Sequence, residues 1–484
     1  MVRPIISEIV ISKNASFLFL LSSALIIIGS IGISIYITII RQYSQNHIFG
    51  FISLIVVGLL IYAILKYIKH KLIGNAYLLS TNSDWERIFP KEVNETDETY
   101  IKIIGKIYRL QDAVNAYLVD EVPENFRIIE NSNNWYGKII HGSTILLKYK
   151  VKPVFGTHYF GPLNIDLHDP YGFFTVKLQA PLSAEIKVLP SIIIDPREIV
   201  LNLSSRIPGG LSLTNRPGIG IEYFSTRDYI PGDDYRFIDW KATARLRRIM
   251  VKDFEEEASL FILIFFLITP NMYRGAYEIA KVVVMSRLIS TLSNYLAFRG
   301  DIYALGYIVT TYQPIIRFTG YGRGYGHTYF IRNVLSGIPW ITNFFFKDVS
   351  NEFLSIISGM IRREKTNIII FTDFNDNIIF AENILSSLFK LKKLGHNIII
   401  IMPHTLLYEE EFIKLELLRR GKEDLIEPAL TLHKIYSDNK IAIINEIINL
   451  IKNYGFKVIC SSPRDTILSI INELELMRRY YGFV

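Results

Sequence analysis

Residues 227–245 read RDYIPGDDYRFIDWKATAR, and this stretch lies between two parts of the chain with different sequence patterns. Pro231 and Gly232 predict a tight turn. Asp233 or Asp234 can then cap a helix expected over residues 235–246, because a short acidic side chain accepts hydrogen bonds from the first free amides of a helix. The stretch therefore predicts a turn followed by a short charged helix.

Charges of both signs are concentrated in this stretch, which is followed by the acidic run Glu255 to Glu257. On the expected helix, residues three or four positions apart share a face. We interpret the charges as a balanced ion-pair network joining the two flanking parts, and the alternative is acid/base catalysis by the carboxylates. The residues singled out are Pro231, Gly232, Asp233, Asp234, Arg236, Asp239, Trp240, Lys241 and Arg245.

After the stretch, apolar runs alternate with long amphipathic segments. This rhythm predicts a doubly wound, mostly parallel α/β sheet over residues 258–484. The expected strands are Leu260–Ile268, Ile302–Val309, Asn367–Phe371, Asn397–Met402 and Lys457–Cys460.

Before the stretch, residues 84–205 contain short alternating runs rich in β-branched residues, such as Thr99–Ile104 and Ser143–Tyr149. Proline, glycine and asparagine separate the runs at short intervals. This pattern predicts an antiparallel, immunoglobulin-like β-sandwich.

The N-terminal residues 1–75 predict a transmembrane hairpin with spans at about 15–40 and 48–65, because both runs lack charged residues. The connection at residues 41–47 is too short for a domain, so both ends emerge on one side. Lysines follow the second span, and only Arg41 is charged in the connection. The positive-inside rule then places both termini in the cytoplasm, and glycosylation at Asn94 or Asn202 would reverse that topology.

The chain has 484 residues, of which 50% are hydrophobic and 20% charged, which suits a multidomain membrane protein. The net charge is +7. Residues 1–75 hold six basic residues and one acidic residue, a balance of +5 that leaves +2 for the remaining 409 residues. Most of the positive charge therefore lies beside the predicted membrane spans, where it indicates their orientation. The remainder of the chain is nearly neutral, which argues against nucleic-acid binding.

Residues 227–245 closely resemble the signature of the family called domain of unknown function 58, which has a Pro-Gly-Asp, Arg, Ile-Asp-Trp, Thr-Ala-Arg pattern. We expect the whole family signature segment to span residues 222–257. Residues 156–162 and 169–173 resemble the family's lead-in to that signature. The resemblance implies a membrane-anchored protein with a von Willebrand factor A-like domain. It also implies a partner, an AAA+ ATPase of the MoxR type.

In many von Willebrand A-like domains a divalent cation binds at the carboxyl ends of the central strands. Leu267 stands here where the first strand would end in aspartate. Thr269 and Asn271 can offer neutral oxygens, and Asp373 follows another strand. With one carboxylate left, we expect a degenerate metal-site rim, no resident cofactor and at most weak Mg²⁺ binding.

The sequence thus predicts a non-enzymatic, membrane-anchored binding or assembly factor in the cell membrane. Its soluble domains would be cytoplasmic and would present the α/β domain to an AAA+ ATPase or its client protein. Two alternatives remain open. One is a hydrolytic enzyme that uses Asp233, Asp234 and Asp239, and the other is an outward-facing adhesive protein.

Overall fold

A computed structural model of the chain describes residues 2–39, 46–123, 125–198, 217–255, 259–274, 280–340, 346–362, 365–403, 410, 413–414, 417–418 and 421–481. The chain divides into two compact units, Met1–Val188 and Leu189–Val484. The predicted sequon at Asn202, and the last residues of the predicted segments 84–205 and 222–257, lie outside the described residues.

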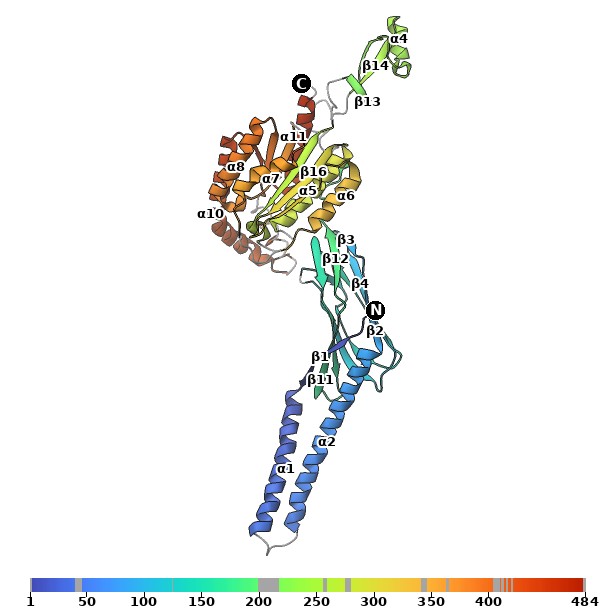
Figure 1. The fold of residues 1–484 in the computed structure, drawn as a ribbon, viewed down its shortest axis with the longest axis vertical. Helices are drawn as coiled ribbons and strands as arrows, with labels where there is room; N and C mark the ends of the chain where they lie inside the picture. Colours follow the sequence, from blue (N-terminus) through green and yellow to red (C-terminus); the bar gives the residue numbers. More distant parts are fainter. Residues whose placement is uncertain are drawn as a thin grey trace. The chain divides into compact units, whose positions relative to one another are not determined.

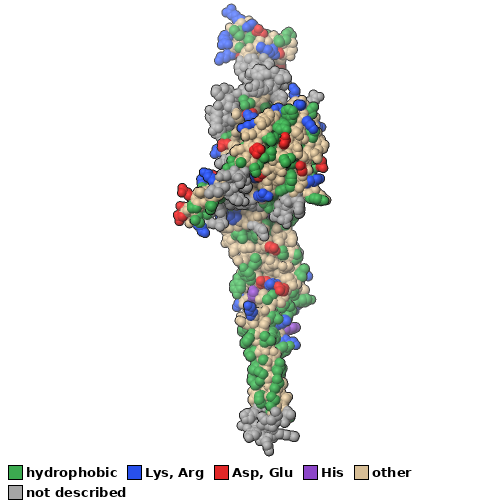
Figure 2. All heavy atoms as spheres, turned by 90° about the vertical axis from the view of Figure 1, so that its left-hand side faces the viewer, with side chains coloured by type: hydrophobic (Ala, Val, Ile, Leu, Met, Phe, Trp, Pro, Cys, Tyr) green, Lys and Arg blue, Asp and Glu red, His purple; other side chains and the backbone are tan. Residues whose placement is uncertain are grey.

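Two long helices form an antiparallel pair in the first unit, α1 (Lys13–Ile39) and α2 (Asn46–Thr81) (Figure 1). Both are long and apolar enough to cross a membrane, and only 11% of each candidate span is buried. Figure 2 shows hydrophobic side chains along the visible face of the pair. Helices that leave apolar side chains uncovered in this way are suited to lipid as their surroundings.

Helix α2 does not end near residue 65, where the second span was expected to stop, but continues to Thr81. Its last turns pack on the β-sheets of the same unit, and Leu72, Ala76 and Leu79 are buried in the shared core. The polar residues after position 65 lower the hydropathy without ending the helix. Helix α2 therefore runs without a break from its apolar, span-like part into the core that it shares with the sheets.

Strand β1 (Ile5–Ile11) precedes α1 and pairs with β11, so both ends of the hairpin lead into the same group of sheets. The sequence did not predict this strand. The other strands of the unit are β2 (Ser83–Ile88), β3 (Glu92–Asn94), β4 (Thr99–Ile107), β5 (Val114–Asp120), β6 (Arg127–Glu130), β7 (Asn134–Ile139), β8 (Thr144–Lys152), β9 (Gly156–Phe160), β10 (Leu163–His168), β11 (Phe174–Ala180) and β12 (Ala184–Leu189).

The strands form antiparallel sheets with the orders β1-β11-β10-β5-β7, β2-β4-β8-β6 and β3-β12-β9. The antiparallel sheets expected in this part of the chain are therefore present, and the described strands end at Leu189. Alternate residues of β4, β8, β10 and β11 share one core. Within it, Asp120 pairs with Arg87 and accepts a hydrogen bond from Tyr149, and all three side chains are buried.

The second unit contains a six-stranded sheet of order β17-β16-β15-β18-β19-β20. Neighbouring strands in this sheet are parallel, except that the edge strand β17 pairs antiparallel with β16. The sequence did not predict β17. The strands are β15 (Phe261–Ile268), β16 (Ile302–Val309), β17 (Ile315–Phe318), β18 (Asn367–Phe371), β19 (Asn397–Ile401) and β20 (Lys457–Ile459).

Helices cover both faces of this sheet (Figure 1). Helices α7, α8 and α10 share a buried core with alternate residues of β15, whereas α5 packs with α6 and α11. The helices are α5 (Lys281–Phe298), α6 (Gly324–Ser336), α7 (Ser350–Met360), α8 (Ile378–Lys393), α10 (Ile426–Asn453) and α11 (Pro463–Tyr481).

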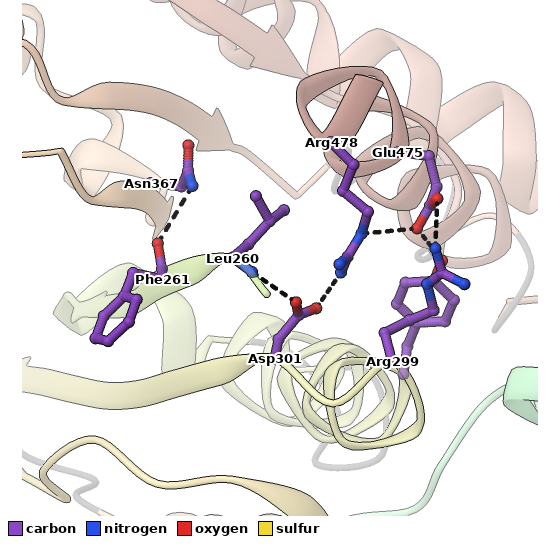
Figure 3. Close-up of polar contacts among 8 residues, drawn as sticks. Leu260, Phe261, Arg299, Asp301, Asn367, Glu475 and Arg478 are labelled. Atoms are coloured by element: carbon purple, nitrogen blue, oxygen red, sulfur yellow. Dashed lines mark hydrogen bonds and ion pairs between the residues drawn. The ribbon is translucent and has the colours of Figure 1, made fainter. Parts of the chain in front are cut away.

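A buried ionic network fixes the C-terminal helix to the sheet at the start of β16 (Figure 3). Asp301 accepts a hydrogen bond from the Leu260 amide at 2.9 Å and pairs with Arg478 of α11. Glu475 accepts from Arg478 and from Arg299, each at 3.1 Å. Burial would lower the pKa of Arg478, but the two carboxylates outweigh it and raise the pKa, so the guanidinium stays charged.

Candidate functional site

The predicted signature forms a hairpin module, with strands β13 (Pro217–Asp228) and β14 (Met250–Glu255) flanking the connecting residues. The turn lies at Pro231-Gly232, where Gly232 has φ 114°, a backbone angle that residues with a Cβ rarely adopt. Arg227 binds Asp233 through two hydrogen bonds of 2.7 and 2.8 Å. The Arg227 hydrogen bonds lower the pKa of Asp233 to about 2. This carboxylate therefore stays ionised, and it stabilises the fold of the module through its pairing with Arg227.

The helix expected over residues 235–246 is broken into a 3₁₀ turn, η1 (Tyr235–Phe237), and helix α4 (Trp240–Leu246). Asp239 causes the break, because its side chain caps α4 by accepting from the amides of Lys241 and Ala242, both at 3.1 Å. Asp234 caps η1 and pairs with Arg236 at 2.7 Å. The single helix expected over residues 235–246 is therefore wrong, and Arg236 and Asp239 do not share a face of one helix.

The remaining signature residues have no such role. Trp240 is 68% exposed and Tyr235 is 75% exposed. Lys241 and Arg245 are exposed on α4, and their side chains form no ion pair or hydrogen bond among the described residues. Figure 2 shows Lys and Arg side chains on the surface of this module. The carboxylates of Asp233, Asp234 and Asp239 thus form contacts within the module. Its aromatic and cationic side chains are exposed to solvent.

Asp239 and Arg245 were both assigned to one ion-pair network from the sequence, but among the described residues only the Asp239 side chain forms hydrogen bonds inside the module. Their substitution should therefore give different results. Asp239→Ala is expected to destabilise the module by about 1 kcal/mol, because α4 loses its cap. Arg245→Ala is expected to change stability by less than about 0.5 kcal/mol. Hydrogen exchange of peptides covering residues 227–250 measures both effects. Equal loss of protection in the two variants would contradict these different roles of Asp239 and Arg245.

The rim predicted from the sequence lies at the carboxyl ends of β15 and β18. These strands are neighbours in the sheet, and the chain runs from β15 to β16 on one side before it crosses to β18 on the other. The rim therefore sits at the point where the strand order reverses, which is where open α/β sheets bind ligands.

The structure brings Thr269, Asn271 and Asp373 together at this point. The Thr269 hydroxyl donates to one Asp373 oxygen, and Asn271 donates to the Asn375 carbonyl at 2.8 Å. Leu267 does not reach the rim, because its side chain is buried in the core of the unit. Three of the four predicted rim residues therefore meet.

The sequence missed the central group of the rim, Lys281, which is the first residue of α5. Its ammonium lies 3.0 Å from Asp373 and 3.6 Å from Asp376. The Lys281 side chain is 9% exposed and that of Asp373 is 2% exposed. A single lysine among the apolar residues that follow Ala280 was the available signal, since buried lysines are rare unless paired.

The loop that carries Asp373 and Asp376 contains a left-handed turn. Phe374, Asn375 and Asp376 all have positive φ values, 50°, 56° and 49°. Asparagine and aspartate tolerate this conformation, whereas phenylalanine adopts it at a cost. The Phe374 side chain is fully buried in the core, so packing offsets that cost.

The donor set at the rim does not fit a divalent cation. One oxygen of Asp373 accepts from Thr269 and the Asn375 amide, and the other accepts from Lys281. An ammonium therefore already neutralises the carboxylates that would hold Mg²⁺. No group of three potential ligands among histidine, cysteine, aspartate and glutamate occurs within the ranges that the structure describes.

Fold and site together define a protein with a membrane-type helical hairpin, antiparallel sheets and a parallel α/β unit, preceded by a compact signature hairpin. Residues 225–340 match the family described as "Protein of unknown function DUF58". The resemblance inferred from residues 227–245 is thereby confirmed over this segment. No curated protein matches the chain.

Three solved structures resemble the chain weakly. An aerotolerance-related membrane protein from Bacteroides fragilis is 13% identical, with a TM-score of 0.24, covering 30% of this chain and 67% of that one. The PilB minor pilin from Streptococcus sanguinis is 7% identical, with a TM-score of 0.30, covering 85% and 97%. A FixG-related protein from Vibrio parahaemolyticus is 9% identical, with a TM-score of 0.16, covering 22% and 96%. Scores this low carry no argument about function.

Proposed function

We propose that this protein is a membrane-anchored, non-enzymatic binding factor that presents its α/β unit and signature module to a protein partner. The partner is an AAA+ ATPase of the MoxR type or its client. One observation carries the proposal. The signature carboxylates are committed to contacts inside the hairpin module, while Trp240, Lys241 and Arg245 face solvent.

Exposed tryptophan and arginine are the side chains that most often dominate protein interfaces. In the hairpin, three acidic residues pair with three arginines: Asp228 with Arg248, Asp233 with Arg227, and Asp234 with Arg236. The cations on α4 are left without acidic partners among the described residues. The exposed face therefore suits an acidic protein surface with an apolar centre.

The strand order supports a von Willebrand A-like fold for the sheet. The first strand, β15, is central, and the antiparallel strand β17 lies at the edge. The rim is a second binding face, where Tyr312 follows β16 and is 80% exposed. Because Lys281 supplies the positive charge there, we propose that this face binds its partner without a metal.

Both soluble parts are proposed to be cytoplasmic, because Lys66, Lys69 and Lys71 follow the second span. The adhesive alternative needs the opposite topology, and glycosylation at Asn94, which lies at the end of β3, would favour it.

The hydrolytic alternative needs a free carboxylate in the signature. Asp233 has instead a bidentate arginine partner and a pKa lowered to about 2 by it. Such a group is a poor general base near neutral pH. Turnover of a hydrolysable substrate that is lost in Asp233→Ala would nevertheless establish the enzyme and overturn the proposed function.

The test is native purification of the full chain from its own membranes, followed by identification of what accompanies it. The proposal predicts an AAA+ ATPase in the purified complex. A purified protein that brings no ATPase and no client with it would contradict the proposal.

A further inference from the structure

An open groove of about 780 Å³ lies beside α2, on the side where α1 begins. Phe19 of α1 and Tyr62 of α2 belong to its apolar part, with ring centroids 6.0 Å apart in an edge-to-face arrangement, and Ala63, Tyr67 and Ile73 complete that part. Lys66, Lys69 and His70 line the rest, and all three lie on one face of α2 because they are three and four residues apart. Aromatic and cationic groups therefore share one cavity.

The groove lies at the depth where α2 leaves the hydrocarbon. The apolar part of α2 begins at Phe49. At about 1.5 Å per residue, Lys66 is roughly 26 Å further along the helix, close to the thickness of a hydrocarbon core of ~30 Å. Tyr62 and Tyr67 are largely exposed there, as aromatic residues at a membrane interface are. The cations therefore stand at the level of the lipid headgroups.

The charge of the groove is uncompensated. No acidic residue lines it, and its two lysines form no ion pair among the described residues. A second groove, on the neighbouring face of α2, is lined by Lys71, Asp112 and Asp169. There Lys71 pairs with Asp112 at 3.1 Å. Only the first groove thus offers free positive charge.

We infer that the first groove binds the phosphodiester headgroup of an anionic phospholipid. Lys66 and Lys69 contact the phosphate, and Phe19 and Tyr62 pack against the upper part of the acyl chains. Basic pockets between helices at the membrane surface recognise anionic lipids in this way. The inference requires that α1 and α2 cross the bilayer, and it is independent of any protein partner.

The test uses the full chain in lipid nanodiscs that contain phosphatidylglycerol and phosphatidylcholine in equal amounts. Native mass spectrometry then measures the ratio of the two lipids that stay bound. Wild type is expected to be enriched in phosphatidylglycerol. Lys66→Gln/Lys69→Gln is expected to lower the enrichment roughly 25-fold, because each lysine near an anionic surface contributes about fivefold.

Lys71→Gln is the matched control, since it removes a lysine whose charge Asp112 already neutralises, and it should keep the enrichment. Lys66→Arg/Lys69→Arg should also keep it, which separates lost charge from lost folding. Soluble glycerol phosphate should not displace the lipid, because it lacks the acyl chains. Bound lipid in the bulk ratio for wild type, equal loss in Lys71→Gln, or displacement by glycerol phosphate would overturn the inference.

Discussion

Asp301→Ala is expected to destabilise the α/β unit by about 3–5 kcal/mol, because it leaves the Arg478 guanidinium buried beside an alanine. The carboxylate also accepts from the Leu260 amide at the start of β15, and that amide would lose its partner. Helix α11 and strand β16 should therefore loosen together. Hydrogen exchange of the full chain measures this as lost protection in peptides from both elements, while peptides from β4 and β8 in the other unit keep theirs.

Asp228→Ala provides the matched control, because it also removes an aspartate that pairs with an arginine. Asp228 and Arg248 are 59% and 61% exposed, and exposed pairs contribute about 0–1 kcal/mol. If Asp301→Ala were as mild as Asp228→Ala, the network of Figure 3 would not fix α11 to the sheet.

Lys281→Ala is expected to have a comparable effect for the opposite reason, since it leaves the Asp373 carboxylate buried without a cation. A cost of about 3–5 kcal/mol is expected in the absence of divalent ions. The vacated space is lined by Asp373, Asp376 and Thr269, whose oxygens suit Mg²⁺. Added Mg²⁺ should therefore restore about 2–3 kcal/mol to this variant, at concentrations well above its dissociation constant.

Wild type should show no stabilisation by Mg²⁺ and no response to a chelator, because Lys281 already neutralises the site. Lys281→Ala/Asp373→Ala serves as the control and should not recover with Mg²⁺. Thermal unfolding with and without Mg²⁺ distinguishes the cases. Tight Mg²⁺ binding by wild type that Asp373→Ala abolishes would show that the rim is a working metal site.

Strands β15, β16, β18 and β19 could be predicted from the sequence because each is an almost fully buried apolar run. The short edge strand β20 could be predicted from its place between two helical segments. The run at residues 367–371 matches β18 residue for residue. Edge strand β17 was missed, because its pattern is short and mostly exposed. Strand β1 was missed for another reason: it is stabilised by pairing with β11, about 170 residues away, and no local pattern reports that contact.

Only part of the candidate site could be predicted from the sequence. Turn and capping residues act on their near neighbours, so the roles of Gly232 and Asp239 follow from local rules. Lys281 and Asp373 are 92 residues apart, and their contact arises only when α5 and β18 pack in the same unit. The position of the helix break was also missed, because Asp239 competes with Asp234 as a cap and both are used.

In the proposed function, the exposed face of the signature module, which includes Trp240 and Arg245, binds a protein partner. The most direct test compares native purifications of wild type and of Trp240→Ala/Arg245→Ala from membranes, with the amount of co-purified AAA+ ATPase measured by mass spectrometry. The variant is expected to retain its fold and membrane location and to lose at least about tenfold of the ATPase, because interface anchors of this type contribute about 2 kcal/mol or more. Equal amounts of ATPase in wild type and in the folded variant would contradict the claim.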